Sequence, residues 1–104
     1  VDNVPILVFD EIDTGVGGET VKKIADKLYD IGENAQIICI THSPAIAAKA
    51  SQQFYIEKKN IDGKTIATVK NLNPDERVDE IARMLAGNNV SESVRNYAKD
   101  LLKG

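Results

Sequence analysis

The alternation of apolar and polar positions along this chain predicts strands and helices in turn. Two short apolar runs, residues 6–9 and 36–41, are rich in β-branched side chains, which is typical of strands buried on both faces of a parallel sheet. Between them, apolar residues recur at helical spacing over residues 19–31, and Gly32 follows where the helix should end. Because a strand, helix, strand unit crosses over with a right hand, we expect the two strands to be parallel.

The next part of the chain changes from helical to strand-like patterning. Residues 54–59 and 65–70 are β-rich, and the pair Asp62-Gly63 between them is typical of hairpin turns. We therefore expect an antiparallel hairpin, with its turn over residues 60–63, appended to the parallel sheet. Four lysines of this hairpin suit a solvated edge that discourages aggregation better than a phosphate-binding track. They are Lys58, Lys59, Lys64 and Lys70.

Three further helices are predicted from their start signals. Ser43 caps a short alanine-rich helix that extends to about Ala50, Asn73 and Glu76 form a capping box, and Ser91 caps the last helix. The positions expected to face the core are Val78, Ile81, Ala82 and Leu85 in the second of these helices, and Val94, Tyr97, Ala98, Leu101 and Leu102 in the third. With no repeat, low-complexity segment or linker in view, residues 1–104 are expected to form a single α/β unit.

The composition excludes several kinds of binding site and partner. The 104 residues carry a net charge of −3 and contain no block of basic residues, so this segment is not expected to be a main contact for DNA. The single cysteine, Cys39, excludes an internal disulfide and a cysteine-rich zinc site, and it should behave as a small buried apolar residue. No secretory signal or membrane-spanning run is present, which favours the cytoplasm and no membrane partner. Because the chain starts at Val1, just before a buried-looking strand, we expect a fragment.

The candidate chemistry lies at the carboxyl ends of the two predicted parallel strands. Asp10 and Glu11 end the first strand, Asp13 follows, and His42, the only histidine, ends the second. In open α/β sheets ligands bind at this edge, where two carboxylates can hold Mg²⁺ and orient a water molecule near a phosphate. The plainer alternatives are that the acids only solvate a turn and that His42 is a loop histidine without a role.

Three segments carry a resemblance to a known family. DEIDTGVGG, ITHSPAIAAKA and ERVDEIARMLAG, which together cover most of the chain, resemble the second half of an ABC-type ATPase head among the P-loop NTPases. More narrowly they resemble the RecN family of bacterial DNA repair proteins, relatives of the SMC proteins. The resemblance implies the carboxyl-terminal lobe of such a head, in an SMC-like ATPase that serves double-strand break repair and recombination.

The resemblance also implies roles for individual residues. Asp10 becomes the Walker B carboxylate that helps hold Mg²⁺, usually through its water, and Glu11 the residue that polarises the attacking water. Asp13 and Thr14 fall in the nucleotide-binding loop that crosses the dimer interface of such heads. His42 becomes the switch histidine that contacts the γ-phosphate.

Other family motifs are absent from these residues. No GxxxxGK[ST] phosphate loop, signature motif or glutamine loop occurs, so we expect this chain alone to bind ATP and Mg²⁺ weakly or not at all. The partners that the resemblance implies are the amino-terminal lobe of the same head and a second head in an ATP-dependent dimer. DNA would be bound by the parent protein, in the cytoplasm at the nucleoid. Two alternatives remain: a DExx-type helicase fragment, since DEID fits that motif, and a non-enzymatic α/β interaction module.

Overall fold

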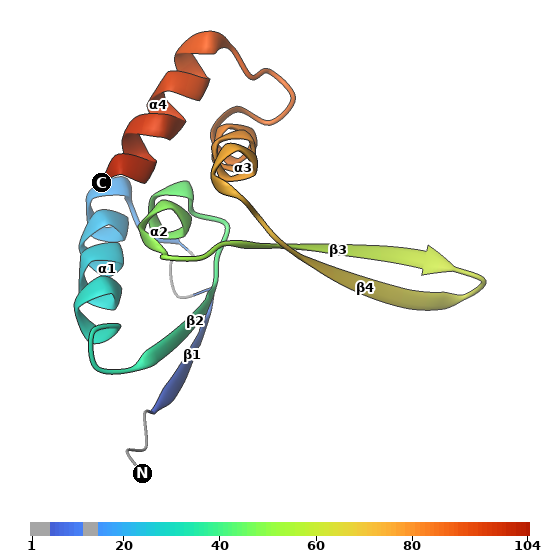
Figure 1. Cartoon of the computed structure of the whole chain (residues 1–104), viewed down its shortest axis with the longest axis horizontal. Helices are drawn as coiled ribbons and strands as arrows, with labels where there is room; N and C mark the ends of the chain where they lie inside the picture. The colour runs from blue at the N-terminus through green and yellow to red at the C-terminus, as the bar shows by residue number, and fades with distance from the viewer. Residues whose placement is uncertain (1–4, 12–14) are drawn as a thin grey trace.

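A computed structural model of the chain describes residues 5–11 and 15–104 (Figure 1). Every predicted element is present, and the predicted α/β class with a parallel strand pair and a hairpin is confirmed. Among the described residues, however, the hairpin forms a two-stranded sheet of its own and does not join the parallel pair. The elements in order are β1 (Ile6–Asp10), α1 (Gly18–Ile31), β2 (Gln36–Ile40), α2 (Pro44–Lys49), β3 (Phe54–Ile61), β4 (Lys64–Asn71), α3 (Pro74–Ala86) and α4 (Glu92–Lys103).

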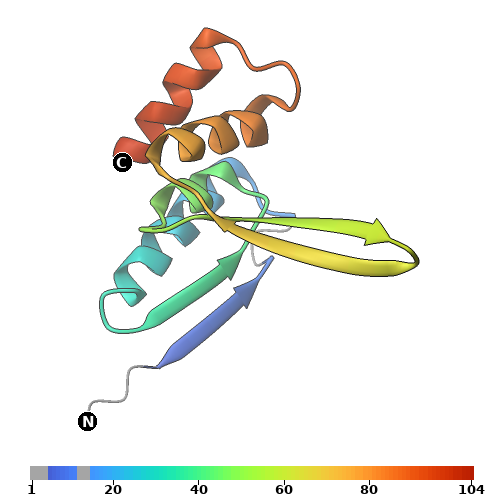
Figure 2. The same cartoon turned by 45° about the vertical axis from the view of Figure 1, so that its right-hand side comes forward.

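The strands β1 and β2 lie side by side in parallel, as the crossover rule predicted (Figure 2). Their register pairs Ile6 with Gln36 at one end and Asp10 with Ile40 at the other. Because the strands are equal in length and in step, both end at the same edge of the sheet. Glu11, which follows Asp10, and Thr41, which follows Ile40, are therefore close to each other at that edge.

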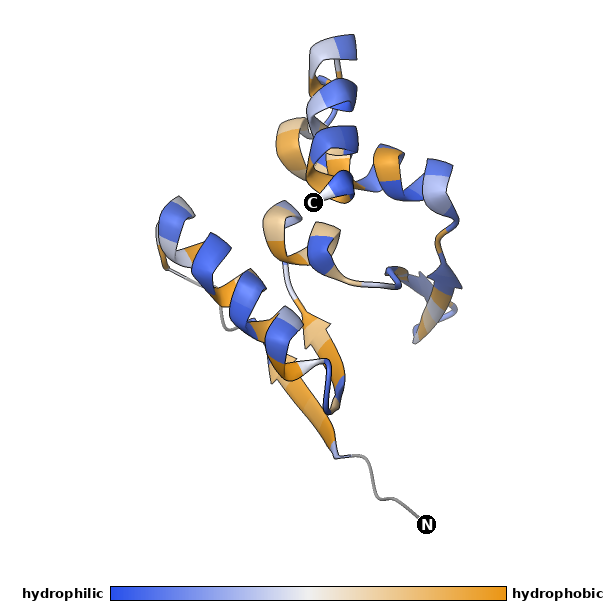
Figure 3. Ribbon diagram, turned by 60° about the vertical axis from the view of Figure 1, so that its left-hand side comes forward, coloured by the Kyte–Doolittle hydropathy of each residue, from blue (hydrophilic) through white to orange (hydrophobic). Residues whose placement is uncertain are grey.

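The prediction that both strands are buried on both faces is wrong for this chain. Residues on the α1 side are partly covered, whereas the opposite face is open, and Cys39 is half-buried rather than buried. The open-face residues are Ile6, Val8, Ile38 and Ile40, with exposed fractions of 66%, 62%, 49% and 43%. Figure 3 shows the apolar strands beside the polar outer side of α1. Among the described residues, only α1 packs against the strand pair, and it covers one face. We call Ile6, Val8, Ile38 and Ile40 the open face.

The core lies among the helices. Ala48 of α2, Ile81 and Ala82 of α3, and Ala98 of α4 are buried against one another. Partly buried apolar side chains surround them, namely Ala47, Val78, Met84, Leu85, Val94, Leu101 and Leu102. Tyr97, predicted to face inward, is 51% exposed instead. Ala98, the next residue, is fully buried, so α4 contacts the core through this small side chain instead.

The hairpin β3–β4 projects from the body as an arm (Figure 1). Its turn is tighter than predicted, since Asn60 and Ile61 still pair with β4 and only Asp62 and Gly63 form the loop. Both loop residues have positive φ, 49° and 76°, as a type I′ turn requires. All residues of β4 are exposed, which agrees with the prediction that the lysines of the hairpin are solvated.

Candidate functional site

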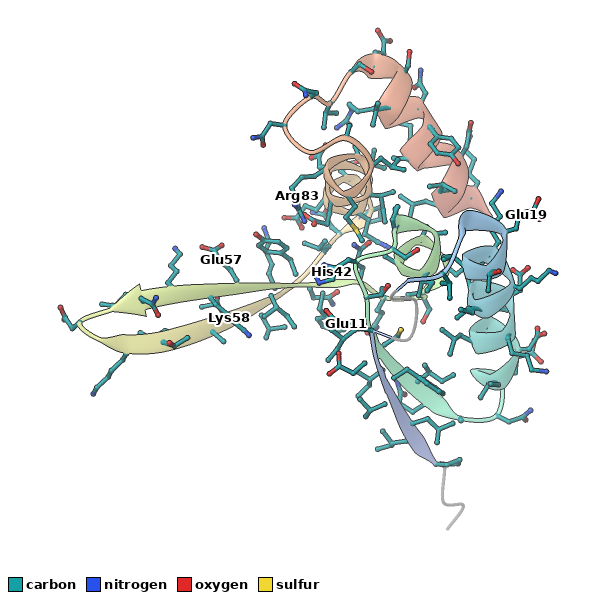
Figure 4. All side chains as sticks on the ribbon, turned by 180° about the vertical axis from the view of Figure 1, so that it is seen from behind. Glu11, Glu19, His42, Glu57, Lys58 and Arg83 are labelled. Atoms are coloured by element: carbon teal, nitrogen blue, oxygen red, sulfur yellow. The ribbon has the colours of Figure 1, made fainter. Side chains whose placement is uncertain are left out.

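The candidate site is formed where β1 and β2 end. The backbone N–H of Glu11 donates to the carbonyl of Ile40 at 2.8 Å, which extends the β ladder one residue beyond β1. Glu11 then turns the chain with a φ of 52°, an uncommon conformation for a residue with a side chain. Its Oε1 lies 3.0 Å from Nε2 of His42 (Figure 4). The structure thus brings together two residues that the sequence placed at the same edge.

His42 is positioned by the tight connection between β2 and α2. The N–H of Ser43 donates to Oγ1 of Thr41 at 2.9 Å, and Oγ of Ser43 accepts from the N–H of Ile46 at 3.5 Å. The second bond is the helix cap predicted for Ser43. These bonds connect Thr41, Ser43 and Ile46, so the backbone at His42 is held by the start of α2.

The Glu11–His42 pair is exposed to solvent on the side seen in Figure 4. The exposed fractions are 87% for the His42 side chain and 50% for that of Glu11. A polar contact between side chains this exposed contributes at most ~1 kcal/mol to stability, so folding alone gives little reason for the arrangement. A strained backbone at Glu11 is also a cost to the fold. Chemically, the pair offers a carboxylate that can accept a proton and an imidazole that can donate to a phosphate oxygen.

Asp10, the predicted Mg²⁺ ligand, is the exposed last residue of β1. By strand alternation it lies on the same side of the sheet as Ile6 and Val8, which is the open side. Within residues 5–11 and 15–104, no group of three or more metal-ligating side chains is present. A single carboxylate nevertheless suits Mg²⁺, which is bound by one or two carboxylates with the remaining ligands from water and substrate phosphates. Asp13 and Thr14, the other predicted site residues, lie outside the described residues.

The two described residues of the pair lie at an exposed edge of the sheet. Two shallow hollows of about 310 and 300 Å³ lie elsewhere, one between α3 and α4 and one between α1, α2 and α4. Neither is lined by Glu11 or His42. In the part of the chain that the structure describes, no helix combines the length and apolar character that crossing a membrane requires.

Sequence reasoning missed one residue, Arg77 in the first turn of α3. Its guanidinium donates to the carbonyls at the end of α2, those of Ala47 at 3.1 Å and Ala50 at 2.9 Å, and its Nε donates to Oε1 of Gln53 at 3.2 Å. Burial lowers the pKa of the Arg77 side chain. One signal for it exists in the sequence: a cation near a helix N-terminus opposes the helix dipole, so a compensating contact elsewhere is expected.

Sequence comparison finds relatives among DNA repair proteins. No family model matches the chain. The chain is similar to DNA repair protein RecN of Bacillus subtilis (strain 168), at 44% identity over 97% of this chain and 18% of that protein. RecN of Deinococcus radiodurans is 41% identical over 98% of this chain and again 18% of the relative. The chain therefore spans about 18% of the length of the curated relatives that it matches.

Structural comparison finds SMC heads. An Smc head domain with a coiled coil and joint from Pyrococcus yayanosii matches 74% of this chain and 14% of that chain, with a TM-score of 0.60 and 27% identity. A structure from work on ATP-driven dimerization and DNA-stimulated activation of SMC ATPases matches 83% of this chain and 51% of that chain. Its TM-score is 0.63, and at 23% identity it shows the fold alone. These relatives do not favour the helicase alternative.

Proposed function

We propose that the chain forms the carboxyl-terminal lobe of an SMC-like ATPase head. The premise is that it belongs with the RecN proteins of DNA repair over the part of those proteins that it spans. The lobe would supply Walker B and switch-histidine groups for ATP hydrolysis in double-strand break repair and recombination. The observation that carries the proposal is the 3.0 Å approach of Glu11 to His42 at the carboxyl ends of two parallel strands.

In this proposal the side chains at the strand ends divide the work of phosphoryl transfer. Glu11 orients and polarises the attacking water, while His42 donates to the γ-phosphate as negative charge develops there. Asp10 would hold Mg²⁺, directly or through a water molecule. When bound, Mg²⁺ neutralises phosphate charge. The contact between Glu11 and His42 restrains both side chains, so less ordering remains to be done when the substrate arrives.

The open face supports a head that is completed by residues outside this chain. The four open-face residues are 43% to 66% exposed, whereas single-domain proteins rarely leave a continuous apolar patch uncovered. The hairpin presents a second apolar stripe, with Phe54, Ile56 and Val69 exposed by 52%, 52% and 64%. Strand pairing places these three on one face of the hairpin, because Ile56 is opposite Val69 and Phe54 is two residues before Ile56.

That hairpin face is the one turned away from α3. Lys58 lies on this face by alternation, and Figure 4 shows Glu57 and Lys58 on opposite sides of the ribbon. Glu57 points to the side of the hairpin on which Arg83 of α3 lies (Figure 4). The open face and the hairpin stripe therefore provide two apolar walls, with Glu11 and His42 where the hairpin leaves the body (Figure 4). We propose that the lobe carrying the phosphate loop packs there and brings ATP to the site.

Further parts of the proposal concern the assembled protein. A second head in an ATP-dependent dimer would meet the loop that contains Asp13 and Thr14. DNA would be bound mainly by other segments, since this chain has a net charge of −3. The site of action would be the nucleoid, in the cytoplasm.

Reconstitution tests the proposal. The chain is co-expressed with the amino-terminal lobe of its parent protein, and ATP hydrolysis is measured with and without Mg²⁺. We expect Glu11→Gln to lower kcat by ~10²-fold or more, because the amide cannot accept a proton. Glu19→Gln, at the exposed start of α1, is the matched control and should leave the rate unchanged.

Two results would contradict this function. Equal hydrolysis by the wild type and the Glu11→Gln variant would remove the proposed role of Glu11. Strong turnover by the chain alone would show that the phosphate-binding lobe is not needed. A non-enzymatic interaction module, the remaining alternative, predicts no hydrolysis in any combination.

A further inference from the structure

The helix α2 has only six residues, Pro44–Lys49, and connects directly to His42. Isolated helices of this length do not persist in water, because nucleation costs more than a single turn repays. The helix therefore depends on contacts at its two ends and on the burial of Ile46 and Ala48. At its first end the cap is Ser43, the residue that follows His42.

At its second end α2 is held by Arg77. Nη2 of Arg77 donates to the carbonyls of Ala47 at 3.1 Å and Ala50 at 2.9 Å, with a longer approach of 3.5 Å to Ala48. These are groups of the last turn of α2, where the helix dipole is negative and a cation is favourable. One guanidinium thus replaces the hydrogen bonds that a longer helix would have provided.

The same guanidinium reaches the segment that follows α2. Nε of Arg77 donates to Oε1 of Gln53 at 3.2 Å, and Gln53 is only 8% exposed. The backbone carbonyl of Gln53 accepts from the N–H of Leu72 at 2.9 Å, just before α3 begins. Partial burial lowers the pKa of Arg77, and its bonds to four acceptors compensate for the lost hydration. Arg77 therefore fixes α2 relative to α3 and to the base of the hairpin.

We propose that Arg77 is a positioning residue for His42: by clamping the end of α2, it keeps the imidazole within hydrogen-bond distance of Glu11. Its importance for catalysis rests on the proposed function, whereas its effect on the position of His42 does not. A purely structural role would instead lower the stability of the chain and leave His42 beside Glu11 in every folded molecule.

The position of His42 is measured by NMR on the whole chain. Because His42 is the only histidine, its ring protons give one assignable set of signals. Glu11→Gln defines how these signals respond when the carboxylate partner is lost. We expect Arg77→Met to shift the ring signals in the same direction as Glu11→Gln does. Arg95→Met, on α4 and paired with Asp79, removes an arginine that makes no contact with His42 or the end of α2 among the described residues, and it should leave the signals unchanged.

Activity of the reconstituted head gives a second, separate test. We expect Arg77→Met to lower kcat by roughly 10- to 100-fold with little change in KM, because a small displacement of a reacting group has effects of this size. Arg77→Lys keeps the charge but not the planar fork, so it should recover part of the loss. In a His42→Ala background, Arg77→Met should have no further effect on kcat.

The outcomes separate the two proposals. Folded Arg77→Met with unchanged His42 signals would overturn the positioning role, even if hydrolysis is observed. If Arg77→Met does not fold, Arg77→Gln takes its place, because its shorter side chain cannot bridge the Ala47 and Ala50 carbonyls and Gln53, and unchanged ring signals in that variant have the same meaning. Additive losses of kcat for the Arg77 and His42 substitutions would likewise overturn it. Absence of hydrolysis together with shifted ring signals would instead count against the ATPase function alone.

Discussion

Glu11 and His42 are 31 positions apart in the chain, yet Oε1 of one lies 3.0 Å from Nε2 of the other. The contact follows from the parallel register of β1 and β2, which ends both strands at one level. It also requires the positive φ of Glu11, because an extended residue there would continue along the strand direction. Backbone strain at the predicted catalytic carboxylate is the kind of local cost that functional sites retain.

Relief of that strain gives the first prediction. Glu11→Gly should be about 1 kcal/mol more stable to unfolding than Glu11→Ala, because glycine adopts positive φ without a steric cost. Chemical denaturation of both variants measures the difference. The side-chain contact with His42 is lost in both, so it cancels from the comparison. Equal stabilities would mean that the backbone at Glu11 carries no strain.

The second prediction concerns the open face. Ile38→Lys should change the free energy of unfolding of the chain by no more than about 0.5 kcal/mol, because Ile38 is already 49% exposed. The same change should prevent the amino-terminal lobe from binding, since a lysine would be buried without a partner. Tyr97→Lys, at a residue 51% exposed on α4, is the matched control. Binding measured by calorimetry that is equal for both variants would place the partner elsewhere.

The third prediction tests the helical core. Ile81 is fully buried between α2, α3 and α4, so Ile81→Ala should lower the free energy of unfolding by about 2–5 kcal/mol. Ile56→Ala removes the same atoms from the hairpin, where the side chain is 52% exposed, and should cost much less. Urea denaturation of the two variants provides the comparison. Similar losses would show that the hairpin is packed in solution.

The fourth prediction is a pH dependence at the start of α3. The hydrogen bond from Lys70 and then the backbone N–H of Asn73 lower the pKa of Glu76 below its ordinary value. A carboxyl whose folded pKa is depressed contributes stability above its unfolded pKa and loses it as pH falls through the folded pKa. The stability advantage of the wild type over Glu76→Gln should therefore be constant at neutral pH and shrink below about pH 4.

Unfolding curves of the wild type and Glu76→Gln at several pH values make this measurement. Glutamine retains an oxygen for the capping box, so the comparison isolates the charge. Lys70→Met should reduce the same pH dependence, because Lys70 makes the largest contribution to the lowered pKa. A constant difference down to pH 3 would contradict the assignment.

The elements were predictable from the sequence because each has a local signal. Asn73 and Glu76 form both bonds of the capping box, and Asp62-Gly63 forms the hairpin turn. The shared edge of Glu11 and His42 was predictable because crossover handedness determines the direction of the second strand. The catalytic roles of Asp10, Glu11 and His42 stay predictions, because no ligand geometry tests them.

Burial and long-range contacts were not predictable in the same way. The apolar runs of β1 and β2 predicted two covered faces, but the second cover is not supplied by the described chain. Arg77 was missed because its acceptors are mostly backbone carbonyls, which every residue has, so no side-chain pattern marks them. Contacts of this kind become visible only when α2 and α3 are placed together in space.

The open face also affects how quickly the chain would be degraded in a cell. Exposed isoleucine and valine side chains beside free strand edges are what chaperones and proteases recognise in incompletely assembled proteins. A copy synthesised without its complement would be degraded faster than one that has found it. When the two lobes are co-expressed, the level of this chain should then rise with the supply of the amino-terminal lobe.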